Sequence, residues 1–126
     1  MYPLVYHKNL TIEKWSKYSA GRQILMIANE LNRAKNRIKH GSTEEVNLCY
    51  ERAMELTDLT SSDPKWKSGL KELRRFRETL GWVYISEKKD LKMNFLIYRT
   101  LIQLRSESWN LLGGSDASAG LSSRKE

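Results

Sequence analysis

Histidine and cysteine are the first residues to inspect for catalysis or metal binding. This chain has few of them, and their spacing does not match a known ligand or catalytic pattern. Neither of its two histidines, His7 and His40, follows a glutamate by three positions, as in the metal-binding pairs of helical bundles. The single cysteine, Cys49, cannot supply a zinc ligand set. The sequence also lacks a Gly-x-Ser-x-Gly motif and a glycine-rich phosphate loop. We therefore expect no catalytic residue, metal or cofactor, and no enzyme.

A polar ridge between residues 22 and 37 has chemistry suited to nucleic acid. Arginines contact phosphates, amide side chains reach base edges, and aromatic residues just upstream could stack on unpaired bases. The candidate residues are Arg22, Asn29, Asn32, Arg33, Asn36 and Arg37. A solvated helix face is the alternative, because no recognition-helix or zinc-finger pattern accompanies the ridge.

Arg33 and His40 lie in one predicted helix with six residues between them. This spacing is similar to the active-site motif of HEPN helical bundles, many of which are metal-independent ribonucleases or partners of nucleotidyltransferases. The resemblance implies that Arg33 would bind phosphate and that His40 would act as acid or base on an RNA backbone. The alternative role of His40 is structural, because a cation in the last helical turn stabilises the terminal carbonyls.

Two arginines interrupt otherwise apolar helix faces. Arg77 lies among Leu73, Leu80 and Tyr84, and Arg105 lies between Ile102 and Trp109. A buried guanidinium must be paired, so we expect a structural ion pair for which Glu30, Glu51 or Glu72 would supply the carboxylate. A pocket for an anionic ligand is the alternative.

Charge and composition limit the class of protein. The net charge is +7 and the isoelectric point about 9.6, which suits nucleic acid or an anionic surface. Segment 42–63, however, has a net charge of −5 and lies between basic segments. Its carboxylates can therefore form ion pairs with many of the basic side chains of the same chain. A lone cysteine and the lack of a signal-like or membrane-spanning apolar run predict a cytoplasmic protein without a membrane partner.

Periodicity and capping signals predict four long helices. The first covers residues 11–39, either as one helix or as a short turn at 11–18 followed by a main helix from about Ser19. The second runs from the capping box Ser42–Glu45 to about Thr60, the third from Asp63-Pro64 to about Ile85, and the fourth from Leu91 to Leu112. The prediction is an all-α, up-down-up-down four-helix bundle in a single domain, 1–114, with an irregular N-terminal segment and a disordered tail, 115–126.

The predicted helices contain more apolar residues than one core can use. The core faces of the first three are Ala20, Ile24, Ile27, Leu31, Ala34 and Ile38; Val46, Cys49, Tyr50, Ala53 and Leu56; and Trp66, Leu70, Leu73, Phe76, Leu80, Val83 and Tyr84. The fourth is expected to bury Leu91, Phe95, Tyr98, Ile102, Trp109 and Leu112. A second stripe then remains on its opposite side: Met93, Ile97, Leu104 and Leu111. The first helix leaves Trp15, Tyr18, Leu25 and Met26.

A second apolar stripe needs a partner to cover it. The leading hypothesis is therefore a non-catalytic interaction module that self-associates or docks on a protein partner through the stripe of the fourth helix. A nucleic-acid-binding accessory protein that uses the Arg/Asn ridge is the alternative, followed by the HEPN-like ribonuclease.

Overall fold

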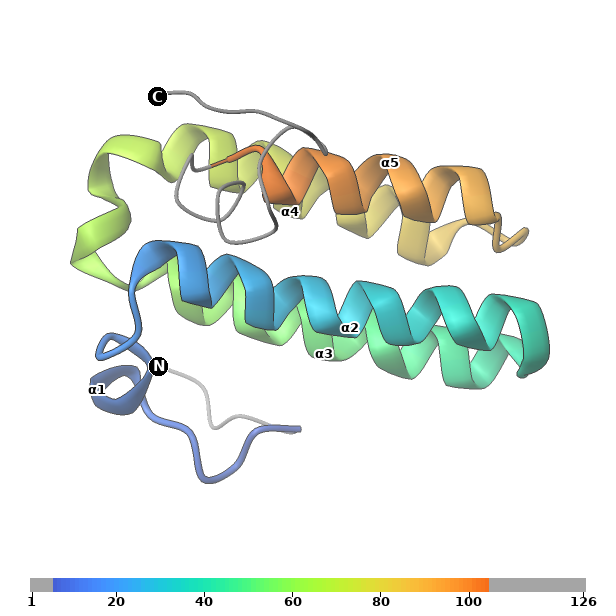
Figure 1. The fold of residues 1–126 in the computed structure, drawn as a ribbon, viewed down its shortest axis with the longest axis horizontal. Coiled ribbons are helices and arrows are strands. Elements are labelled where there is room, and N and C mark those ends of the chain that lie inside the picture. Colours follow the sequence, from blue (N-terminus) through green and yellow to red (C-terminus); the bar gives the residue numbers. More distant parts are fainter. Residues whose placement is uncertain (1–5, 105–126) are drawn as a thin grey trace, which may run out of the picture.

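The computed structural model describes residues 6–104, and all regular secondary structure within this range is helical (Figure 1). The elements in chain order are α1 (Ile12–Trp15), α2 (Ala20–His40), α3 (Thr43–Ser61), the 3₁₀ helix η1 (Pro64–Gly69), α4 (Leu70–Ile85) and α5 (Leu91–Ile102). The predicted all-α class is confirmed for this part of the chain.

Side-chain caps start the helices where the sequence predicts. Thr11, Ser19 and Ser42 accept backbone N–H groups at the starts of α1, α2 and α3, so the first predicted helix is divided in two near Ser19. Asp63 caps η1 rather than one long helix, because the chain passes through six residues of 3₁₀ helix before α4 begins. Asp90 caps α5.

Two features of the predicted helix ends are wrong. The Ser42 hydroxyl accepts the N–H of Glu45, as in a capping box, but the Glu45 carboxylate lies 3.2 Å from Arg37 Nε. The second half of the capping box is thus replaced by an ion pair between α2 and α3. Helix α5 ends at Ile102, ten residues before the predicted Leu112, and Gln103 donates its N–H to the Arg99 carbonyl there. Positions from Arg105 onward lie outside the described residues.

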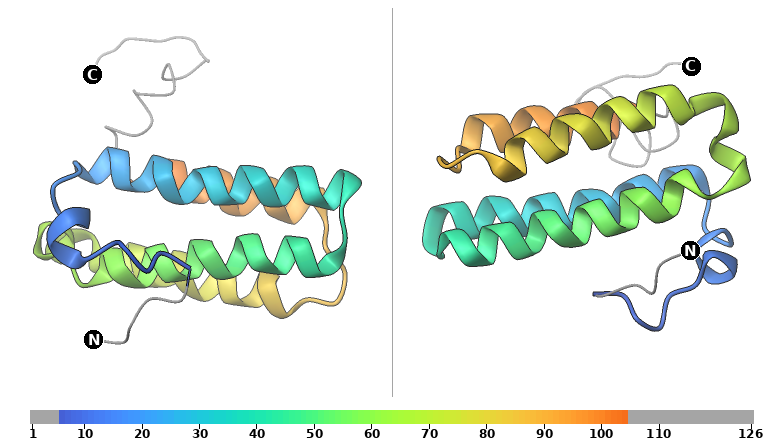
Figure 2. Two further views of the ribbon diagram at one scale, coloured as in Figure 1. Left: turned by 90° about the horizontal axis from the view of Figure 1, so that it is seen from below. Right: turned by 180° about the vertical axis from the view of Figure 1, so that it is seen from behind.

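The long helices form two layers. Helices α2 and α3 make one hairpin and α4 and α5 a second hairpin stacked on it, while α1 and the segment before it lie on the far side of the α2–α3 layer (Figures 1 and 2). The packing is α2 against α3 and α5, and α4 against α3 and α5. The two layers enclose one apolar cluster, which includes Ile24, Leu31, Tyr50, Phe76 and Leu80.

The buried side of α5 differs from the predicted one. Asn94, Ile97, Leu101 and Ile102 are buried, whereas Leu91 and Phe95, both predicted core residues, are exposed. The Asn94 amide donates to the Leu31 carbonyl at 3.1 Å and to the Tyr50 hydroxyl at 3.0 Å, which satisfies a polar group inside the core. The buried seam runs between the two predicted stripes and takes residues from both, with a hydrogen-bonded asparagine in its centre.

A buried hydrogen-bond network holds α1 against the main helices. Trp15 is fully buried, and its indole N–H donates to Thr60 Oγ1 at 2.9 Å. The Gln23 amide donates to the Trp15 carbonyl and to Asp63 Oδ2, both at 2.9 Å, and it accepts the Trp66 indole N–H at 2.7 Å. These contacts fix the junction of α1, α2, α3 and η1.

Candidate functional site

The predicted association residues are distributed between core and surface. The predicted exposure of Trp15 and Ile97 is wrong, because both are core residues at 0% and 1% exposed. Leu25, Met26 and Leu104 are half-buried against the core. Met93 and Tyr18 are exposed, and Leu111 lies outside the described residues. The second stripe as predicted is therefore not a single surface.

The largest exposed apolar side chains gather instead around the turn between α4 and α5. We call this set the hairpin surface: Trp82, Ile85, Leu91, Met93, Phe95 and Leu96. Their exposed fractions run from 40% for Leu91 to 69% for Trp82. Only three other large apolar or tyrosine side chains are similarly exposed within residues 6–104: Tyr6 before α1, Tyr18 between α1 and α2, and Leu48 on α3. An apolar concentration of this kind is typical of an interaction surface.

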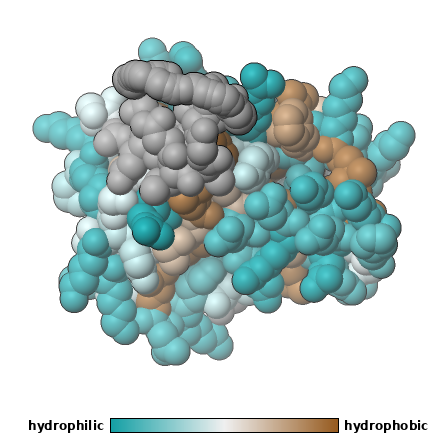
Figure 3. Space-filling model, in the orientation of Figure 1, coloured by the Kyte–Doolittle hydropathy of each residue, from teal (hydrophilic) through white to brown (hydrophobic). Residues whose placement is uncertain are grey.

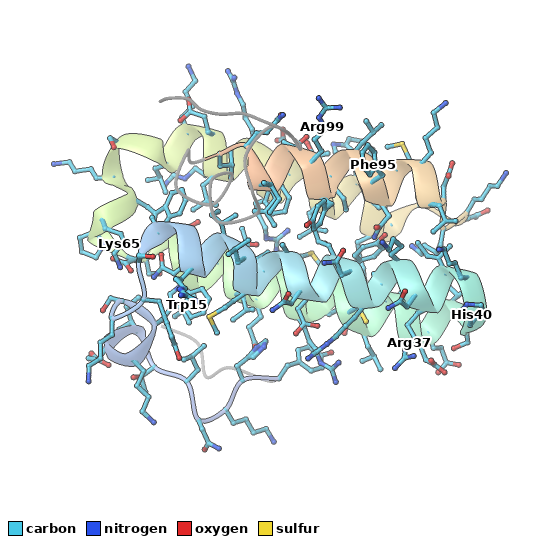
Figure 4. All side chains as sticks on the ribbon, viewed as in Figure 1. Trp15, Arg37, His40, Lys65, Phe95 and Arg99 are labelled. Carbon is cyan, nitrogen blue, oxygen red and sulfur yellow. The ribbon has the colours of Figure 1, made fainter. Side chains whose placement is uncertain are left out.

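The helical repeat explains how α5 exposes apolar residues on both flanks of its buried seam. At about 100° per residue, Met93 and Leu96 lie on one side of Ile97, and Leu91 and Phe95 lie on the other. Apolar residues are visible over the first half of α5 among polar ones (Figure 3). The Phe95 side chain points away from the bundle, as does the Arg99 side chain one turn further on (Figure 4).

The charged residues bordering the hairpin surface are mainly basic. Lys88, Lys92 and Arg99 are exposed, with Glu87 as the exposed acid in the same stretch. Lys89 has a structural role, because its ammonium donates to the Ser86 carbonyl at 2.6 Å beyond the end of α4, and burial lowers its pKa. Asp90 is engaged as the cap of α5. The border thus has an excess of positive charge.

Ion pairs occupy much of the predicted Arg/Asn ridge on α2. Arg33 Nη1 lies 3.1 Å from Glu30 Oε2, and Arg37 Nε lies 3.2 Å from Glu45 Oε1. Arg22, Asn29 and Asn36 are exposed and Asn32 is half-buried. The sequence pattern did not reveal that two of its three arginines have carboxylate neighbours.

Arg33 and His40 lie on one face of α2 but two turns apart, which is about 10 Å along the axis. His40 is exposed in the last turn of α2 and projects at the end of the bundle near Arg37 (Figure 4). This position fits the structural role of a cation at a helix C-terminus.

The Arg77 side chain has an ion-pair partner that sequence reasoning missed. Arg77 Nε lies 2.8 Å from Asp58 Oδ1, so the pair joins α4 to α3, and neither side chain is buried. The expected carboxylates and the expected buried environment are both wrong. Glu51, one of the expected carboxylates, instead accepts hydrogen bonds from the Tyr84 hydroxyl at 2.6 Å and from the Tyr6 hydroxyl. These bonds are the main reason that the pKa values of both tyrosines are raised. Arg105 lies outside the described residues.

Within residues 6–104, no group of three or more histidine, cysteine, aspartate or glutamate side chains is arranged to hold a metal ion. The Cys49 thiol is buried, and burial raises its pKa, so little of the reactive thiolate is present. No helix in this range combines the length and apolarity needed to cross a bilayer.

Comparisons of the chain with protein-family models, with curated proteins and with solved structures found no match.

Proposed function

We propose that this protein is a non-catalytic helical interaction module that docks on a protein partner through the hairpin surface. In this proposal α2 to α5 form an up-down-up-down four-helix bundle, a single domain whose core fixes the position of that surface. The partner is an acidic amphipathic helix.

The exposure of the hairpin surface is the observation that supports docking. Trp82, Ile85 and Phe95 each expose more than half of their side chains. Aromatic residues of this kind dominate the free energy of binding when a partner excludes water from them. Leu91 and Phe95, one turn apart on one flank of α5, would provide apolar contacts for the apolar face of an amphipathic helix.

The basic border favours an acidic partner over a second copy of the chain. A symmetric dimer would bring Lys88, Lys92 and Arg99 of each copy close to the same cations of the other. Across residues 64–104 the net charge is +6, so the repulsion extends over the whole α4–α5 layer. Glutamates that flank the apolar face of a partner helix would complement these charges and speed association at low salt.

The test uses a synthetic helical peptide as the probe. It would have about five turns, with leucine and phenylalanine at i, i+3, i+4 and i+7 and glutamate at flanking positions. A matched peptide with lysine in place of glutamate is the control, and binding is followed by fluorescence anisotropy. We expect the acidic peptide to bind more tightly, with affinity falling as salt is raised. Phe95→Ser and Trp82→Ser should each weaken binding about tenfold, a typical loss for an aromatic anchor.

Leu48→Ser is the control substitution, because Leu48 on α3 is as exposed as Met93 but lies outside the hairpin surface. Equal binding by wild type and the hairpin variants, or preference for the lysine peptide, would contradict the proposal. Sedimentation of the protein without peptide tests whether the surface binds a second copy of the chain. A wild-type dimer that becomes a monomer in Phe95→Ser would assign the surface to self-association. Tight RNA or DNA binding lost in Arg22→Ala would favour the ridge instead.

A further inference from the structure

The side of α4 that faces away from the core carries basic side chains at one end and an aromatic one at the other. Four buried residues line its inner side: Leu73, Phe76, Leu80 and Val83. At about 100° per residue, the opposite side includes five exposed residues, which we call the α4 stripe: Lys71, Arg74, Arg75, Glu78 and Trp82. The stripe extends along most of the helix, which is seen in full from behind (Figure 2, right).

The three cations of the α4 stripe have no carboxylate partner in the described part of the chain. None of the five ion pairs within residues 6–104 includes Lys71, Arg74 or Arg75. Arg77, on the flank of the same helix, is engaged with Asp58. On the α2 ridge, by contrast, two of the three arginines have carboxylate neighbours. The cations of the α4 stripe are therefore more available to an external anion than those of the ridge.

The basic end of the stripe surrounds an open hollow of about 300 Å³. Its lining residues are Lys71, Arg74, Arg75 and Glu78, so three cations and one carboxylate give it a net charge of +2. Two of these cations are arginines, whose planar guanidinium groups can donate to two oxygens of one phosphate. The hollow is thus suited to a ligand that carries phosphate groups.

Trp82 supplies an apolar ring at the other end of the stripe. It is 69% exposed, the largest fraction among the exposed large apolar side chains of residues 6–104. Along the helix axis it lies about 10 Å from Arg75 and about 16 Å from Lys71. Unpaired bases stack on exposed aromatic rings while neighbouring cations bind the phosphates. About five stacked nucleotides, at about 3.4 Å each, would cover this length.

From this arrangement we infer that the α4 stripe binds single-stranded nucleic acid. Phosphates would contact Lys71, Arg74 and Arg75, and a base would stack on Trp82. An anionic membrane fits less well, because an interfacial helix separates its basic and apolar residues around its circumference, whereas the stripe separates them along the axis. The inference does not depend on the docking proposed above, and the stripe shares only Trp82 with the hairpin surface.

Fluorescence anisotropy with labelled single strands of twelve uridines or twelve thymidines tests the inference. Contacts with three phosphates, at about 0.7 each, predict a slope of about −2 when the logarithm of the binding constant is plotted against that of the salt concentration. Binding of either strand with this salt dependence supports the inference. The strand that binds more tightly identifies the source as RNA or DNA.

Substitutions separate the phosphate contacts from the stacking contact. Arg75→Gln should weaken binding and make the salt slope shallower by about 0.7. Trp82→Ser should weaken binding at least about fivefold and leave the slope unchanged. A duplex of twelve base pairs has no unpaired base, so Trp82→Ser should not affect its binding.

Arg22→Gln is the matched control, because Arg22 is an exposed arginine of α2 outside the stripe, and it should change neither the affinity nor the slope. All three substituted positions are exposed, so circular dichroism should show each variant folded.

Four results would overturn the inference. The first is the absence of binding by both strands at about 20 mM salt, where phosphate contacts are strongest. The second is an equal loss of affinity in Arg22→Gln and Arg75→Gln, and the third is an unchanged affinity in Trp82→Ser. The fourth is binding to phosphatidylserine vesicles in place of single strands, lost in Trp82→Ser, which would assign the stripe to a membrane surface.

Discussion

At the scale of single residues, Asp63 shows how one carboxylate can join several elements. It is 4% exposed, and it accepts from Gln23 Nε2 and Lys65 Nζ, each at 2.9 Å, and from the backbone N–H of Lys65 at 3.1 Å. Burial on its own would raise the pKa of this carboxyl. The hydrogen bonds from Gln23 and Lys65 outweigh burial and hold the pKa below its ordinary value.

Asp63→Asn tests this balance through the pH dependence of stability. Since the folded-state pKa is lowered, the stabilisation is complete above the ordinary carboxyl pKa and is lost as pH falls through the folded-state value. Asparagine still caps η1 but loses the charge, so we expect a loss of about 1–2 kcal/mol in the free energy of unfolding at pH 7. Urea denaturation should show the difference from wild type shrinking below about pH 4. A difference that stays constant from neutral to acid pH would contradict this account.

Cys49 gives a second prediction at this scale. The thiol is 3% exposed in the core, and burial, the main cause, raises its pKa. Both effects slow attack on a disulfide reagent. We expect the native protein to react with Ellman's reagent at a rate limited by opening of the fold, and the protein in urea to react at once. Rapid labelling of the native protein would show that the contact between α2 and α3 opens easily.

At the scale of elements, substitutions at two positions of α5 can test which of its faces is buried. Ile97 is 1% exposed and Phe95 is 56% exposed. Ile97→Ala should therefore reduce the free energy of unfolding by about 2–4 kcal/mol, because it leaves a cavity in the core. Phe95→Ala should change it by less than about 0.5 kcal/mol. Urea denaturation of both variants measures the contrast, and the reverse order would restore the face predicted from apolar periodicity.

Helix starts could be predicted from the sequence, but the buried face of α5 could not. Short-range signals such as Ser19, Ser42 and Asp63 predict helix starts because the capping hydrogen bonds are local. The face of α5 could not be predicted from its apolar residues, because Asn94 lies in the seam and its two acceptors come from α2 and α3, distant in sequence. Arg77 was beyond reach for a similar reason. Its partner Asp58 lies on α3, and the two side chains meet only once α3 and α4 pack.

At the scale of the whole molecule, segment 42–63 is an acidic strip between basic neighbours. Four of the five ion pairs within residues 6–104 use one of its carboxylates: Glu45 with Arg37, Glu55 with His7, Asp58 with Arg77, and Asp63 with Lys65. The basic partners come from the N-terminal segment, α2, η1 and α4. Individually such pairs contribute little when exposed. Together they place the segment of net charge −5 where it offsets the repulsion among elements that are net positive.

Acid should convert this attraction into repulsion across the whole fold. When the carboxylates are protonated, 22 lysines and arginines and two histidines remain as cations without opposing charges. At pH 3, salt then screens only repulsion. Raising the ionic strength from about 10 mM to about 100 mM shortens the Debye length from about 30 to about 10 Å. We therefore expect the melting temperature at pH 3 to rise. At pH 7 the same change screens attraction and repulsion together, and we expect a smaller shift. Melting followed by circular dichroism measures both shifts, and equal shifts at the two pH values would mean that segment 42–63 does not balance the positive charge of its neighbours.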